Sequence, residues 1–161
     1  MFSMYAAVIL SFVFATVTAE FDKEICTSYS YSEITCCMNE YPGRMVDVPY
    51  VMMAECLATK KTMCEKQLCR AKGMGLTDDN DKLDRSKVLD IMFKKVLDDP
   101  SLLEEVKAKC INGDITPYEA VGACEGEIVS RCITTQWLKR CPNWNDSSTC
   151  QQFKDVFVKE C

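Results

Sequence analysis

The stretch TPYEAVGACEGEIVSRCITTQWLKRC, residues 116–141, carries the strongest signals for the fold. It opens with a capping box, because Glu119 lies three residues after Thr116, and Pro117 occupies the first helical position. Cysteine and apolar residues then recur at spacings of three and four, which places them on one face of a helix: Val121, Cys124, Ile128 and Cys132. The stretch therefore predicts a long amphipathic helix over residues 117–139.

The beginning of the chain has a different composition. Residues 1–19 carry no charged side chain, contain an apolar run over residues 6–14 and end in Val17-Thr18-Ala19. A short apolar run with a small-x-small ending is typical of a secretory signal peptide, cleaved here after Ala19. A membrane anchor is the alternative, but the run is too short to span a bilayer comfortably. We expect a single secreted, extracellular domain over residues 20–161.

Helix signals also dominate the rest of that domain, whereas no alternating run of β-branched residues predicts a strand. Proline near the first turn, polar capping residues and apolar stripes mark the elements. Helices are expected over residues 47–58, 62–72, 84–97, 100–111 and 150–161, with Gly73 as the C-terminal cap of the second. The expected fold class is all-α, a compact bundle of six to seven helices.

The composition excludes several classes of function. Histidine is absent, so a Ser-His-Asp or Cys-His nucleophile and a His-ligated zinc site cannot be built. A net charge of −5 gives no basic footprint for nucleic acid. A glycosidase would need two acidic residues facing each other across a cleft, whereas the acids here mostly occupy capping positions and outer helical faces. We therefore predict no enzymatic activity, no cofactor, no metal and no nucleic-acid partner.

Twelve cysteines in a secreted chain of this length predict a scaffold of about six disulfides. A disulfide needs Cα atoms closer than about 7 Å. Cysteines eight to eleven residues apart on one helix are separated by about 12–16 Å, because an α-helix rises about 1.5 Å per residue. This spacing disfavours three bonds: Cys124–Cys132, Cys132–Cys141 and Cys150–Cys161. The disulfides are therefore expected to join separate helices.

The cysteine spacing resembles that of the insect odorant-binding proteins of the pheromone-binding and general-odorant-binding type. The last five of their six cysteines follow the same order: Cys64-x4-Cys69, then forty residues to Cys110, then Cys132-x8-Cys141. The remaining cysteines resemble the cysteine-rich branch of that family, called Plus-C. Its marks here are the Cys36-Cys37 doublet, Pro142 directly after Cys141, and the trailing Cys150 and Cys161.

The resemblance implies three interlocking disulfides, from the first to the third, the second to the fifth and the fourth to the sixth family cysteine. On this chain they are Cys37–Cys69, Cys64–Cys132 and Cys110–Cys141. Whether Cys36 or Cys37 takes the first position stays open. The remaining six cysteines form three further bonds whose pairing stays open: Cys26, Cys36, Cys56, Cys124, Cys150 and Cys161.

The apolar stripes of the predicted helices either pack on each other or enclose a cavity, and periodicity does not separate the two. The resemblance implies an apolar cavity inside the disulfide-linked helical bundle. The candidate ligand-binding residues are then residues from the apolar helices and stripes together with Trp137: Met52, Val88, Ile91, Met92, Val96, Leu103, Val106, Val121, Ile128, Trp137, Phe153 and Phe157.

The resemblance implies a soluble carrier that binds and transports small hydrophobic molecules, odorant- or pheromone-like, in extracellular fluid. Its partners would be that ligand and, among macromolecules, a membrane receptor or a second copy of the chain. The alternative is a secreted disulfide-rich interaction protein with a solid core and a protein partner. Asn145-Asp146-Ser147 is a candidate N-glycosylation site in either case.

Overall fold

Helices form the framework of the computed structural model, which describes residues 25–43 and 49–161. Within these ranges two isolated β-bridges occur and no strand, so the all-α prediction is confirmed. The predicted signal peptide lies outside the described residues. The α-helices are α2 (Tyr31–Ile34), α3 (Tyr50–Thr59), α4 (Met63–Gly73), α5 (Arg85–Met92), α6 (Pro100–Val106), α7 (Glu125–Lys139) and α8 (Ser148–Glu160).

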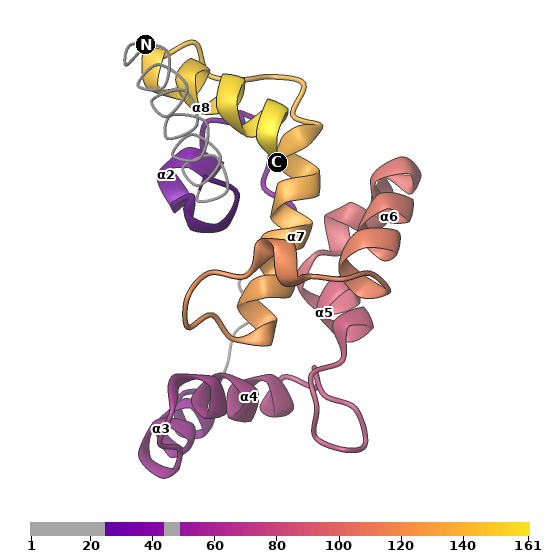
Figure 1. Ribbon diagram of the computed structural model, residues 1–161. Coiled ribbons are helices and arrows are strands. Elements are labelled where there is room, and N and C mark those ends of the chain that lie inside the picture. The colour runs from indigo at the N-terminus through magenta and orange to yellow at the C-terminus, as the bar shows by residue number, and fades with distance from the viewer. Residues whose placement is uncertain (1–24, 44–48) are drawn as a thin grey trace, which may run out of the picture.

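The longest helix, α7, organises the arrangement (Figure 1). The α3–α4 hairpin lies toward one end of α7, while α2 and α8 lie toward the other end. Helices α5 and α6 pack beside α7. Most of α7 is buried, and its apolar side chains join Phe93, Val96 and Val106 in one continuous core. This core joins α5, α6 and α7.

The predicted helix over residues 117–139 is wrong in its first half. Thr116 begins only a short 3-10 turn, Thr116–Tyr118, because Asp114 accepts hydrogen bonds from the Thr116 backbone N–H and hydroxyl at 2.9 and 2.8 Å. Gly122 then adopts a positive φ of 77°, which is incompatible with a continuing right-handed helix. Helix α7 starts afresh at Cys124, whose N–H donates to the Glu127 carboxylate at 3.0 Å.

Most other helix starts match the sequence prediction, while two details of the helix ends differ. Asp84 caps α5, and Asp99 with Pro100 begins α6, which continues as a π-helical turn over Lys107–Ile111. The helix predicted over residues 84–97 ends at Met92 and is followed by a 3-10 turn, Lys94–Asp98, which places Phe93 and Val96 in the core. The left-handed glycine after α4 is Gly75 rather than Gly73.

All twelve cysteines are paired. The bonds are Cys26–Cys161, Cys36–Cys150, Cys37–Cys141, Cys56–Cys69, Cys64–Cys124 and Cys110–Cys132. None joins two cysteines of one helix, as the helical rise predicts.

The three pairings implied by the family resemblance, Cys37–Cys69, Cys64–Cys132 and Cys110–Cys141, are wrong. Cys64 bonds to Cys124, at the start of α7, because α4 meets that end of α7 rather than its middle. Cys132 lies in the middle of α7, fully buried, and bonds instead to Cys110 after α6. Cys69 is used within the α3–α4 hairpin by Cys56, and Cys141 bonds to Cys37.

Two glycine substitutions should have opposite effects on stability. A Cβ atom on Gly113 would lie 2.6 Å from the backbone carbonyl oxygens of Ala108 and Lys109, so Gly113→Ala should destabilise the protein by about 1–3 kcal/mol. A Cβ atom on Gly126, in the first turn of α7, would meet only Leu83 Cδ2 at 3.9 Å. Gly126→Ala should therefore stabilise by about 0.5–1 kcal/mol, because alanine loses less backbone entropy in a helix. Chemical denaturation of the oxidised proteins measures both, and a loss of stability in Gly126→Ala would contradict the described start of α7.

Candidate ligand-binding pocket

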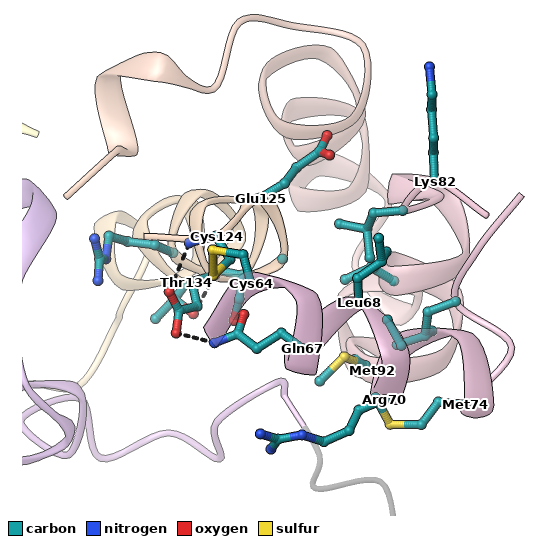
Figure 2. Close-up of a pocket in the computed structure, with 18 of the residues that line it drawn as sticks. Cys64, Gln67, Leu68, Arg70, Met74, Lys82, Met92, Cys124, Glu125 and Thr134 are labelled. Carbon is teal, nitrogen blue, oxygen red and sulfur yellow. Dashed lines mark hydrogen bonds between the residues drawn. A yellow bond between two sulfur atoms is a disulfide. The ribbon is translucent and has the colours of Figure 1, made fainter. Parts of the chain in front are cut away.

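A pocket of about 790 Å³ lies between the α3–α4 hairpin, α5 and the first half of α7. Its size falls in the range of small-molecule sites, roughly 300–1,000 Å³. Figure 2 shows α4 along one side and the Cys64–Cys124 disulfide joining it to the start of α7. The apolar part of the lining comes from Ile34, Met53, Leu68, Ala71, Met74, Leu76, Leu83, Val88 and Met92.

One face of α4 supplies a large part of the lining. Cys64, Gln67, Leu68 and Ala71 follow the three- and four-residue spacing of a helix face, and each lines the pocket. The sequence prediction placed a helix here but assigned none of these residues to a binding site. Their spacing places them on one helix face, but it does not show that this face lines a pocket.

Two tyrosines attach the segment before α3 to the buried face of α7. The Tyr29 hydroxyl donates to the Arg131 carbonyl oxygen at 2.9 Å, and burial raises the pKa of Tyr29 well above its ordinary value. The Thr134 hydroxyl donates to the Ser130 carbonyl oxygen at 2.9 Å, so the Tyr41 hydroxyl donates its own proton to Thr134 Oγ1, also at 2.9 Å. The protons of these hydroxyl groups are therefore used within the protein.

The acidic side chains that line the pocket have partners of their own. Glu127 accepts from the Cys124 backbone N–H at 3.0 Å and from Gln67 Nε2 at 2.6 Å. Glu125 forms an ion pair with Arg85 across 3.0 Å. The negative charge of these two exposed carboxylates is thus paired with, or hydrogen-bonded to, other groups of the protein.

Two of the twelve predicted ligand-binding residues, Val88 and Met92 on α5, line the pocket. The structure places most of the others in the core instead: Val96, Val106, Ile128, Trp137, Phe153 and Phe157 are buried, and Ile91 and Leu103 are half-buried against the core. Met52 lies beside the pocket residue Met53 and packs against the backbone of Gly73. Val121 was expected on the inward stripe, but it is fully exposed because α7 has not yet begun at that position.

Three further features concern other kinds of site. Within residues 25–43 and 49–161, no three His, Cys, Asp or Glu side chains are grouped so that they could hold a metal ion. In the same ranges no helix is long and apolar enough to cross a membrane. Asn145, the candidate glycosylation site, is exposed in the loop before α8, and its Oδ1 accepts from the Ser147 N–H at 2.9 Å.

The pocket therefore combines apolar lining residues, a disulfide within its lining and acidic side chains that are paired by the protein's own groups. In comparisons of the chain with family models, curated proteins and solved structures, nothing matched.

Proposed function

We propose that the protein is a secreted carrier of small apolar molecules, the function that its resemblance to insect odorant-binding proteins implies. The observation that carries the proposal is the pocket of about 790 Å³, whose lining includes nine aliphatic and methionine side chains. Six disulfides are typical of an extracellular or secreted protein. They also resist collapse of the helices onto the pocket.

The energetics of such a site suit reversible transport. Removing about 300 Å² of apolar ligand surface from water contributes roughly 7 kcal/mol at about 25 cal/mol per Å². Micromolar affinity corresponds to about −8 kcal/mol. Three methionines, Met53, Met74 and Met92, line the pocket, and their flexible thioether chains adapt to ligands of different shape.

Filling the pocket should abolish this activity. Met92→Trp adds an indole ring to the lining and should weaken binding of a hydrophobic naphthylamine dye by about tenfold or more, since about 1.4 kcal/mol of lost contact corresponds to a factor of ten. The matched control is Val121→Trp, because Val121 is fully exposed and outside this pocket. Dye fluorescence titrations on both variants measure the difference. Absence of saturable dye binding to the unaltered protein would refute the carrier function.

A second candidate function is protein–protein interaction, and the exposed apolar surface of the α3–α4 hairpin favours it. Five large apolar side chains there are at least 40 % exposed: Tyr50, Val51, Leu57, Met63 and Leu68. Exposed apolar groups that cluster on one element often mark an interface. This candidate takes precedence if the dye does not bind.

A further inference from the structure

Arg70, on the pocket side of α4, has an unmet hydrogen-bonding requirement. Its Nε atom is buried and meets no acceptor among the described residues. A guanidinium group cannot lose its proton in a protein, so this N–H remains a donor at every accessible pH. Buried donors without a partner are rare and cost free energy, so this one calls for an explanation.

The other charged groups at the pocket do not supply an acceptor for the Nε–H of Arg70. Glu125 and Glu127 are held by Arg85, Gln67 and the Cys124 backbone, as described above. Arg131, the other arginine of the lining, donates to the Tyr118 carbonyl oxygen at 3.4 Å. Lys82 extends away from the other labelled side chains, and Arg70 leaves α4 with its guanidinium group pointing away from Met74 (Figure 2). Among the three positively charged residues that line the pocket, Arg70 is thus the one with a buried donor that has no acceptor.

We propose that the ligand is an amphiphile with a carboxylate head, such as a fatty acid, whose head binds Arg70 and whose tail lies along the aliphatic lining. This inference rests on the carrier function proposed above. The planar guanidinium matches a carboxylate, because Nε–H and one Nη–H donate to its two oxygens in parallel. Leu68, Met74 and Met92 line the same pocket and provide apolar contact for the chain.

A carboxylate satisfies this site better than an alcohol or an ester. All three supply an oxygen to the Nε–H, but only the carboxylate carries the charge that complements the guanidinium, and charge-assisted hydrogen bonds are about twice as strong as neutral ones. The tyrosine hydroxyls of the lining offer no compensating donor, because their protons are already used by Arg131 and Thr134.

The test compares three ligands of the same chain length: dodecanoic acid, dodecanol and methyl dodecanoate, each by dye displacement at pH 8. The unaltered protein should bind the acid about tenfold more tightly than the other two. Arg70→Met should weaken acid binding by about tenfold while changing alcohol and ester binding by less than about threefold. Arg70→Lys should recover part of the acid preference, since lysine restores the charge without the planar fork.

The control is Lys72→Met, which makes the same change of charge on the same helix. Lys72 is exposed, pairs with Asp81 at 2.6 Å and does not line the pocket, so its loss should leave the acid preference intact. Equal binding of the three ligands by the unaltered protein would overturn the inference without touching the carrier function, and this comparison needs no variant to fold. An equal loss for all three ligands in Arg70→Met would overturn it as well. If neither dye nor ligand binds, the carrier function itself fails.

Discussion

Replacement of both Cys64 and Cys124 by alanine is expected to abolish binding to the pocket while α5 to α8 remain folded. This disulfide joins α4 to the start of α7, and both cysteines line the pocket. The other bond of the hairpin, Cys56–Cys69, lies entirely within α3 and α4 and cannot replace it. The side-chain hydrogen bond between α4 and α7, from Gln67 to Glu127, is exposed to solvent and adds little.

Loss of this disulfide releases a loop with a sequence separation of 60 residues. A bond of this kind contributes about 2–4 kcal/mol by restricting the unfolded chain. Here the loss of stability should mainly affect the α3–α4 hairpin, because most residues of the core come from α5 to α8 and the segments between them. We expect faster amide hydrogen exchange in residues 50–73 and dye affinity weakened by more than about tenfold.

The matched control is replacement of Cys26 and Cys161 by alanine. That bond spans 135 residues, and neither cysteine lines the pocket. The control should lose at least as much global stability, because the released loop is longer, yet keep its dye affinity. Retention of full dye binding by the Cys64 and Cys124 variant would contradict the role assigned to the hairpin as one side of the site.

The local chemistry of the sequence predicts most of the helices. Asp84, Asp99 and Pro100 mark helix starts through interactions within a few residues, so these starts match the structure. The same logic failed at Thr116, whose capping box competes with a nearby acid, Asp114, and is followed by a left-handed glycine, Gly122. A capping motif predicts a helix only where no equally local alternative competes for its hydrogen bonds.

The disulfide pairing could not be predicted from the local sequence in the same way. Helical rise correctly excludes bonds within one helix, but it leaves open which separate helices meet. That choice depends on packing, and the family pattern selected wrong partners for Cys64 and Cys110. Six cysteines beyond the family's pattern change which sulfur atoms are near each other, so a pairing transferred by order along the chain need not hold.

The proposed binding site could be predicted from the sequence only in part, for a related reason. An apolar stripe looks the same in sequence whether it packs against another helix or faces a cavity, which explains why Val88 and Met92 were identified together with core residues. The group on which the proposed carboxylate preference rests, the buried Nε of Arg70, carries no sequence signal, because an arginine on a charged helix is usually solvated. Only the packing around α4 distinguishes Arg70 from a solvent-exposed arginine.

The second large effect is expected from Phe157→Ala, which should destabilise the protein by about 3–5 kcal/mol. Phe157 lies on α8, is 0 % exposed in the protein core and makes an edge contact with the Tyr29 ring, with ring centroids 5.5 Å apart. It also packs on Phe153, with centroids 4.9 Å apart. Removing the ring leaves a cavity that neighbours fill only in part. Chemical denaturation of the oxidised variant measures the loss, and Phe157→Leu provides a milder change if the alanine variant does not fold.

The sequence assigned Phe157 to the ligand site, whereas the structure assigns it to the core, so stability and affinity must be measured together. A core residue that does not line the pocket should lower stability strongly and leave the dye affinity of the folded fraction within about threefold. Met92→Ala is the matched comparison, because Met92 is half-buried at the pocket and should lose more in affinity than in stability. Phe157 contacts the ring of Tyr29, which lines the pocket. If Phe157→Ala weakens dye binding tenfold at temperatures where it is fully folded, α8 contributes to the site through Tyr29 and the boundary drawn between core and pocket is wrong. If both variants behave as expected, the ligand site is confined to the region where the α3–α4 hairpin meets α5 and α7, and Phe157 contributes to the stability of the fold alone.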